Sequence, residues 1–193
     1  MKKINDIFYS LQGEGRNTGR AAIFIRFSGC NLKCSFCDTE FTDYREMSDD
    51  DIINAIGNYE SRFVVLTGGE PTLQADDAFV DLLHTKGYEV AMETNGTRKC
   101  PDNIDWLTVS PKQRFVGNIG CLAISRCNEL KCLFDESVTV DDYGVSADYY
   151  YLQPCDVGNE ERNSKITSAC IDYILHHPKW RMSLQTHKLI GFK

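Results

Sequence analysis

The sequence predicts an α/β fold, namely an incomplete (β/α) barrel of about six parallel strands with about three well-formed helices. The first observation is that short apolar, β-branched runs alternate with segments of helical periodicity. Such alternation implies parallel strands joined by right-handed crossovers. The second observation is that two of the intervals between the runs are too short for a full helix. A partial barrel with fewer helices than strands accounts for both.

The predicted strands are runs rich in β-branched and aromatic residues. Several are continuously apolar, as strands covered on both faces tend to be. They span residues 21–28, 62–67, 88–93, 105–110, 129–134 and 148–153, with another at 181–186.

Helical spacing of apolar residues is clear in three segments, which are 49–59, 75–86 and 164–177. Ser48 and Asp51 form a capping-box pattern where the first segment begins. Gly87 supplies a stop for the second segment and Pro178 closes the third. We therefore expect three helices with defined ends.

Length and charge limit the class of protein. The chain has 193 residues, of which 42% are hydrophobic, and no linker divides it, so we expect a single domain over 1–193. A net charge of −7 argues against a nucleic-acid partner and favours a small molecule. No segment approaches the roughly 20 apolar residues that span a bilayer, and the first residues lack the apolar stretch of a signal peptide. We expect a cytoplasmic protein with no membrane partner.

The most distinctive residues follow the predicted strands. SGCNLKC follows the first strand, TGGEP the second, ETNGT the third, SPK the fourth and QPCD the sixth. Ligands of β/α barrels bind at the C-terminal ends of the strands. The five loops are therefore expected to converge on one site.

Three of the nine cysteines, Cys30, Cys34 and Cys37, occupy only eight residues. Three thiolates from one loop can hold three irons of a [4Fe–4S] cluster and leave the fourth iron open. The alternative is a zinc site, whose closed form needs a fourth ligand, either a distant residue or Asp38. The other six cysteines are expected to be small core hydrophobes, with a second metal cluster as the alternative.

The run CNLKCSFC followed by TGGEP resembles the radical S-adenosylmethionine enzymes. The resemblance implies that S-adenosylmethionine chelates the open iron, and that one electron then yields methionine and a 5′-deoxyadenosyl radical. Two glycines would admit the methionine part of this cofactor closely, and Glu93 would accept hydrogen bonds from its ribose. The cofactor-binding residues that the resemblance implies are Phe36, Cys37, Asp38, Gly68, Gly69, Glu93, Ser110, Pro111, Lys112 and Gln153.

Four segments carry a closer resemblance: SLQGEG at 10–15, IRFSGCNLKCSFCDT at 25–39, QPCD at 153–156 and QTHKLIGF at 185–192. Together they resemble the 7-carboxy-7-deazaguanine synthases, a family of carbon–nitrogen lyases in 7-deazapurine and queuosine biosynthesis. The resemblance implies ring contraction of 6-carboxy-5,6,7,8-tetrahydropterin with loss of ammonia, begun by removal of the C6 hydrogen. It also implies a homodimer and an external electron donor of the reductase or flavodoxin type.

The resemblance further implies a set of substrate contacts, and residue chemistry supports two of them. The carboxylate of Glu14 suits the guanidine-like edge of a pterin. The planar fork of Arg26 suits the 6-carboxyl group, with a surface salt bridge as the alternative. The implied contacts are Leu11, Gln12, Gly13, Glu14, Arg26, Thr67, His187 and Lys193.

Two further positions in the family pattern concern a metal ligand and the end of the chain. The resemblance makes Thr39 a Mg²⁺ ligand, which agrees with the preference of this ion for oxygen. The alternative is a turn closed by Asp38 and Thr39. Family members often end in a proline whose carboxylate reaches the substrate, whereas this chain ends at Lys193. The Lys193 carboxylate either makes that contact or the contact is lost.

Two other functions fit part of the pattern. A glycyl-radical activase shares CxxxCxxC and GGEP, but it gives no reason for LQGEG. A non-enzymatic zinc-binding module would need only the cysteines and would be colourless.

Overall fold

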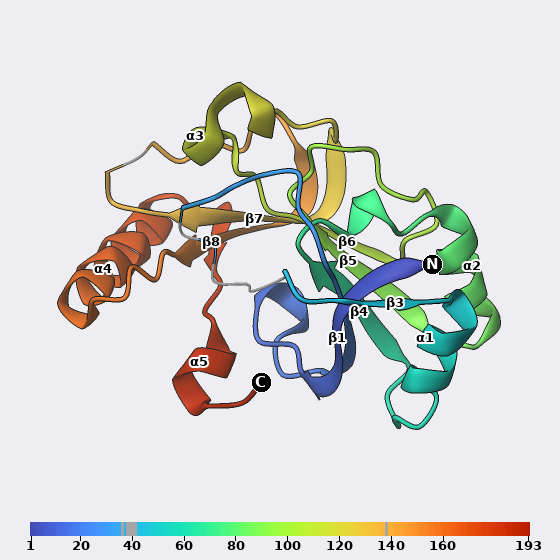
Figure 1. Ribbon diagram of the computed structural model, residues 1–193. Coiled ribbons are helices and arrows are strands. Elements are labelled where there is room, and N and C mark those ends of the chain that lie inside the picture. The colour runs from blue at the N-terminus through green and yellow to red at the C-terminus, as the bar shows by residue number, and fades with distance from the viewer. Residues whose placement is uncertain (36, 38–41, 138) are drawn as a thin grey trace.

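The computed structural model describes residues 1–35, 37, 42–137 and 139–193. Three of the predicted site residues, Phe36, Asp38 and Thr39, lie outside these ranges. Figure 1 shows one twisted sheet, with α1 and α2 on the right and α4 on the left; the N-terminus lies beside α2 and the C-terminus beside α5.

The sheet confirms the α/β fold class and contains more strands than expected. Within the described ranges it has nine strands, in the order β3-β1-β2-β4-β5-β6-β7-β8-β9. The seven strands from β2 to β9 pair in parallel, while β1 is antiparallel to both β2 and β3. The strands are β1 Lys2–Leu11, β2 Ala21–Phe27, β3 Arg45–Met47, β4 Phe63–Gly68, β5 Glu89–Thr94, β6 Trp106–Val109, β7 Arg126–Phe134, β8 Ser146–Pro154 and β9 Trp180–Met182.

The two strands that the sequence analysis missed lie at one edge of the sheet. The pairing of β1 with β2 shifts register between Ile4 and Asp6, so the strict alternation of apolar and polar residues is broken there. β3 has only three residues. The strand expected at 181–186 is shorter than predicted, because the chain leaves the sheet after Met182 and turns into a helix at Thr186.

The three predicted helices are present as α1 Asp49–Ile56, α2 Asp77–Thr85 and α4 Glu160–His176. The capping box is confirmed: Ser48 Oγ accepts a hydrogen bond from Asp51 N–H at 3.1 Å, and the Asp51 carboxylate accepts one from Ser48 N–H. α4 begins four residues earlier than expected, because its first turn is polar and is capped by Asn159. Two short helices, α3 Gln113–Val116 and α5 Thr186–Ile190, were not predicted.

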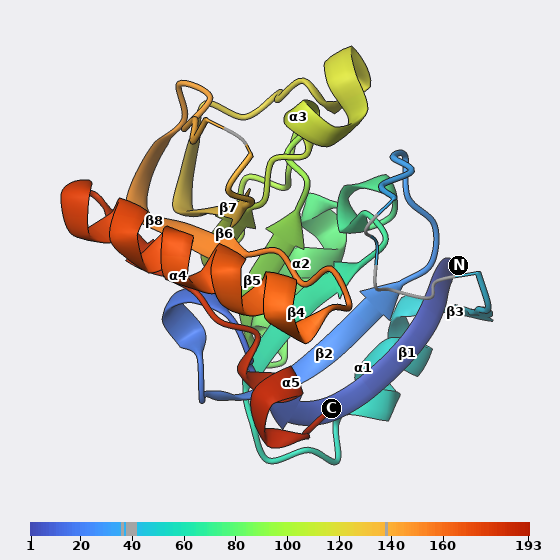
Figure 2. The same cartoon turned by 90° about the vertical axis from the view of Figure 1, so that its left-hand side faces the viewer.

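Three helices, α1, α2 and α4, cover the outer face of the sheet in two groups, as Figures 1 and 2 show. Ile52 of α1 and Phe79 of α2 are fully buried in one core cluster against β1, β2, β4 and β5. Ile166 and Cys170 of α4 are fully buried in a second cluster against β7 and β8. The inner face of the sheet is therefore left for the site.

Successive side chains of a strand point to opposite faces of the sheet, so one strand contributes both to the core and to the cavity. On β7, Leu130 and Cys132 pack into the outer core, while Lys131 and Leu133 line a cavity on the inner side. Cys132 and Cys170 are buried, as predicted. Cys121, in contrast, is exposed, because it lies in the loop after α3 rather than in a strand or helix.

No helix among the described residues has both the length and the apolar character that crossing a bilayer requires.

Candidate active site

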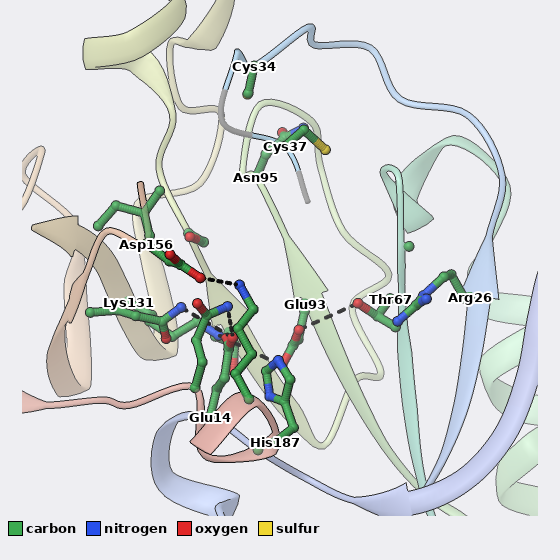
Figure 3. A pocket seen from close by; sticks show the side chains of 18 of the residues that line it. Glu14, Arg26, Cys34, Cys37, Thr67, Glu93, Asn95, Lys131, Asp156 and His187 are labelled. Carbon is green, nitrogen blue, oxygen red and sulfur yellow. Dashed lines mark hydrogen bonds and ion pairs between the residues drawn. The ribbon is translucent and has the colours of Figure 1, made fainter. Parts of the chain in front are cut away.

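A cavity of about 830 Å³ lies where the C-terminal ends of the parallel strands meet. It is lined by all five loops that were expected to converge. Figure 3 shows Cys34 and Cys37 above, Arg26 and Thr67 on the right, and Glu14 and His187 below. The predicted site residues that line it are Leu11, Gln12, Gly13, Glu14, Arg26, Cys30, Cys34, Cys37, Thr67, Gly68, Gly69, Glu93, Ser110, Lys112, Gln153, His187 and Lys193. Pro111 is buried and does not line the cavity.

The cysteine loop follows β2 and presents Cys30, Cys34 and Cys37 to the cavity. Leu32 N–H points at Cys30 Sγ at 3.4 Å, and Cys37 N–H donates to the carbonyl of Cys34 at 3.2 Å. Burial raises the pKa of both the Cys30 and the Cys34 thiol. Within the described ranges no three His, Cys, Asp or Glu side chains lie in a ready-formed metal site.

The donor set fits an iron–sulfur cluster. Three soft thiol ligands come from one loop, and a cavity large enough for another ligand opens beside them. This is the arrangement that a [4Fe–4S] cluster needs when one iron is left to a non-protein ligand. Structural zinc sites are closed by four protein ligands instead.

The glycines of TGGEP bring the loop after β4 against the cysteine loop. A Cβ on Gly68, whose φ is +123°, would lie 2.2 Å from the carbonyl oxygen of Phe27. A Cβ on Gly69 would lie 1.9 Å from the carbonyl oxygen of Gly29. Two hydrogen bonds, from Gly69 N–H to Phe27 O and from Glu70 N–H to Gly29 O, join the loops. Only glycine permits this contact, which is a packing role in addition to the cofactor role that the resemblance implies.

Glu70, the acid of the same motif, is fully buried and holds three segments together. Its carboxylate accepts hydrogen bonds from the N–H and hydroxyl of Thr72, from the hydroxyl of Thr94 and from Asn95 N–H, at 2.7 to 3.1 Å. Asn95 Nδ2 in turn donates to Asn31 Oδ1 at 3.0 Å, and Asn31 is part of the cysteine loop. The buried carboxylate therefore fixes the position of the cysteine loop through Asn95.

A buried lysine, which the sequence analysis did not single out, lies at the centre of the charged part of the cavity. Lys131 of β7 is only 6% exposed. Its Nζ hydrogen-bonds a carboxylate oxygen of Glu14 and lies 3.9 Å from Glu93 Oε1. A lysine inside the apolar strand ELKCLF is the signal that could have indicated it, since buried lysines need partners.

Glu14 is held in its ionised form by these contacts. Its other oxygen accepts hydrogen bonds from Gln185 Nε2 at 3.0 Å and from Gln153 Nε2 at 3.2 Å. Burial by itself raises the pKa of Glu14, but the positive charge of Lys131 and the hydrogen bonds from Lys131 and Gln185 outweigh it and lower this pKa to about 2. The pKa of Lys131 is correspondingly raised, because three nearby carboxylates oppose the effect of its burial.

Stability should therefore depend on pH through Glu14. The folded-state pKa of about 2 lies below the value of about 4.3 in an unfolded chain, so the stabilisation is present above about pH 4.3 and is lost as the pH falls toward 2. We expect Glu14→Gln to lower the free energy of unfolding by about 2–3 kcal/mol at pH 7 and by much less at pH 2.5. Urea unfolding of both proteins at the two pH values measures this. A difference that stays constant with pH would contradict the assignment.

Glu93, at the end of β5, lies where the sequence analysis expected it. Its two oxygens accept hydrogen bonds from Gln12 Nε2 at 2.9 Å and from Thr67 Oγ1 at 3.4 Å. In the SPK loop, Lys112 Nζ donates to both the carbonyl and the hydroxyl of Ser110. Burial, and then the charge of Lys131, lowers the pKa of Lys112.

Arg26 of β2 presents its guanidinium to the cavity. The guanidinium lies over the ring of Phe8, with 5.2 Å between the guanidinium carbon and the ring centroid. No carboxylate in the part of the chain that the structure describes forms an ion pair with it, so the salt-bridge alternative finds no partner there. Among the described residues, the planar guanidinium of Arg26 therefore faces the cavity.

The C-terminal segment closes one side of the site. The N–H and hydroxyl of Thr186 both donate to the carbonyl of Gly13. A Cβ on Gly13 would lie 2.4 Å from His187 Nδ1, so this glycine allows α5 to pack against the QGEG loop. At the chain end, the backbone oxygen of Lys193 accepts a hydrogen bond from Ser10 and its Nζ pairs with Asp6 at 2.6 Å. Lys193 thus lines the cavity, while its side chain pairs with Asp6 and lies over the ring of Phe8.

Several cavity residues were not assigned a role in advance. Asn95 and Gln185 belong to quoted motifs, ETNGT and QTHK, in which other residues were chosen. Asp156 of QPCD, labelled in Figure 3, pairs with Lys188 of α5 at 3.2 Å, and both residues line the cavity. The contacts of these residues are made with segments that are distant in the sequence, so the sequence alone did not indicate their roles.

Comparisons with known proteins show the family of this chain. Residues 24–112, from β2 to the SPK loop, match the Radical SAM superfamily. The chain is 49% identical to the 7-carboxy-7-deazaguanine synthase of Bacteroides thetaiotaomicron over 194 residues, which cover 100% of both chains. It is 40% identical to that of Bradyrhizobium diazoefficiens, with 98% of each chain covered. The crystal structure of QueE from Escherichia coli matches with a TM-score of 0.77 and 32% identity over 96% of this chain and 94% of that one. The chain therefore belongs to the 7-carboxy-7-deazaguanine synthase family of radical S-adenosylmethionine enzymes.

Proposed function

We propose that this chain converts 6-carboxy-5,6,7,8-tetrahydropterin to 7-carboxy-7-deazaguanine with loss of ammonia. The observation that carries the proposal is that a single cavity joins the cysteine loop to an ionised carboxylate, Glu14, and to Arg26. These groups match the two polar ends of a carboxylated pterin. Membership of the family supports the same reaction.

The cofactors would occupy the upper part of the cavity. Cys30, Cys34 and Cys37 would hold the [4Fe–4S] cluster, and Glu93 would accept hydrogen bonds from the ribose of S-adenosylmethionine. When bound, the cluster and S-adenosylmethionine supply a 5′-deoxyadenosyl radical. The chain's own share is to bind, to orient and to exclude water.

The substrate would lie between Glu14 and Arg26. An ionised carboxylate has about four acceptor positions, and three of those on Glu14 are taken by Lys131, Gln153 and Gln185. The remaining position, with the backbone of the QGEG loop, can accept N–H groups from the guanidine-like edge of the pterin. Arg26 would bind the 6-carboxyl group with two parallel hydrogen bonds.

Further elements of the proposal follow from the family resemblance. Thr39 would be a ligand of Mg²⁺, and this ion would bind the substrate and stabilise charge on it. Thr67, His187 and the terminal carboxylate of Lys193 would also contact the substrate. The enzyme would act in the cytoplasm as a homodimer and take its electron from a reductase or flavodoxin-type donor.

The test is anaerobic reconstitution with iron and sulfide, followed by reaction with S-adenosylmethionine, the pterin, Mg²⁺ and a strong reductant. We expect brown protein that forms 7-carboxy-7-deazaguanine, with lower turnover when Mg²⁺ is omitted. Cleavage of S-adenosylmethionine without change in the pterin would contradict the substrate and favour a glycyl-radical activase. A colourless protein with one zinc would contradict the reaction class.

A further inference from the structure

We propose that Lys131 is a positioning residue: it fixes the carboxylates of Glu14 and Glu93 relative to each other, and thereby fixes the position of the substrate subsite relative to the cofactor subsite. The inference rests on the proposed function, in which Glu14 contacts the pterin and Glu93 contacts the cofactor. It concerns the residue between them, which neither the reaction nor the sequence motifs assign.

The geometry places Lys131 between two elements that are far apart in the chain. Glu14 belongs to the loop after β1, Glu93 ends β5, and Lys131 is in the middle of β7. The ammonium group hydrogen-bonds Glu14 and lies 3.9 Å from Glu93, while only 6% of the residue is exposed. Gln12 supports the same arrangement, because its side chain donates to Glu93 at 2.9 Å and accepts from Glu14 N–H at 3.2 Å.

The charges around Lys131 explain what its loss would do. The ionisable groups that face it are Glu14, Glu93, Glu129 on its own strand and Lys112, and His187 of α5 faces Glu14. Lys112 is directed at Ser110. Glu129 is buried, accepts from Arg16 N–H at 2.9 Å and has a pKa raised by that burial. Without the Lys131 ammonium, the largest influence that lowers the pKa of Glu14 would be lost, so burial would raise this pKa and Glu14 would take up a proton more readily.

A protonated Glu14 would bind the pterin poorly. Its new O–H is a donor, and it would face the N–H donors of the guanidine-like edge. Lys131 itself is no general acid or base near neutral pH, because its pKa is raised. Its effect is therefore on the position and charge of the carboxylates, which makes affinity and its pH dependence the proper readouts.

The experiment measures binding of 6-carboxypterin to the anaerobic holoenzyme by fluorescence titration from pH 5 to 8. We expect wild-type affinity to be nearly constant over this range. Lys131→Met should bind roughly 100-fold more weakly at pH 7, and its affinity should improve as the pH rises and Glu14 ionises. Lys131→Arg should restore affinity to within about tenfold of wild type and remove the pH dependence.

A matched control is another buried lysine outside the cavity. Lys2 is 9% exposed and pairs with Asp49 of α1 at 2.6 Å. Lys2→Met should be less stable than wild type but should bind 6-carboxypterin with the same affinity and pH profile. The proposal is overturned if Lys131→Met binds like wild type, or if it is weakened by the same factor at every pH.

Unfolding experiments give a test that does not depend on the pterin. Lys131→Met and Glu14→Gln should each raise the unfolding equilibrium constant by some factor. In the double variant, the rise should be at least about tenfold smaller than the product of the two single-variant factors. If Lys131→Met alone fails to fold, the double variant can be studied in its place, because it removes both charges of the Lys131–Glu14 pair. If the unfolding equilibrium constant of the double variant rises by the full product of the two single-variant factors, the proposal is overturned, even if the wild-type protein converts the pterin. Failure of the proposed function shows separately, as a wild-type protein that does not convert the pterin.

Discussion

Replacing Glu70 with alanine is expected to lower the free energy of unfolding by about 3–5 kcal/mol. The carboxylate is fully buried and accepts four hydrogen bonds from Thr72, Thr94 and Asn95. Alanine would leave the two backbone and two hydroxyl donors buried without acceptors, and each such group is costly. Urea unfolding of the apoprotein at pH 7 measures the loss.

Two further variants make this prediction specific. Glu70→Gln keeps one oxygen acceptor but places an NH₂ group opposite a donor, so we expect an intermediate loss of about 1–3 kcal/mol. The control is Glu60→Ala, because Glu60 is exposed, and its change should stay within about 0.5 kcal/mol. If Glu70→Ala were as stable as Glu60→Ala, the role of this carboxylate in holding the loops would be refuted. Lower iron content in Glu70→Ala would show that the disturbance reaches the cysteine loop through Asn95 and Asn31.

Cys34→Ala is expected to lose the iron–sulfur cluster, and with it the brown colour and all cleavage of S-adenosylmethionine. Its stability as apoprotein should change by no more than about 1 kcal/mol, since the side chain lies half-buried in a loop. Iron and sulfide analysis after anaerobic reconstitution, together with detection of methionine, measures the result.

Two other cysteines serve as controls for this prediction. Cys121 is exposed and does not line the cavity, so Cys121→Ala should keep the full cluster. Cys155 does line the cavity, and it is a thiol that a closed four-ligand site could recruit. We expect Cys155→Ala to keep the cluster as well. Loss of metal in Cys155→Ala would favour a closed site and contradict an open iron.

The fold was largely predictable because its parallel strands are continuous apolar runs and its helices carry clear caps. The strand β1 was not, because the register shift between Ile4 and Asp6 breaks its alternation. The first turn of α4 was missed because Glu160 and Glu161 are polar and their stabilisation comes from the Asn159 cap. In each case the residue pattern and the structure differ where hydrogen bonding rather than burial decides the conformation.

Site residues that directly follow a strand were predictable, because the C-terminal ends of parallel strands meet at one edge of the sheet. Residues whose role depends on a distant partner were not predictable. Lys131 and Glu14 are 117 positions apart, and only the folded sheet brings the lysine to the carboxylate. Glu70 was inside a quoted motif, yet its importance lies in the hydrogen bonds it receives from β5 and the following Asn95. Burial and partners, not residue type, single out both.

The central claim is that one cavity holds the pterin with its guanidine-like edge at Glu14 and its carboxyl group at Arg26. The most direct measurement compares the affinities of wild-type and Arg26→Gln holoenzyme for 6-carboxypterin and for pterin, which lacks the carboxyl group. We expect Arg26→Gln to weaken 6-carboxypterin by about 10–100-fold and to leave pterin binding unchanged. An equal loss for both compounds, or no loss for either, would contradict the account.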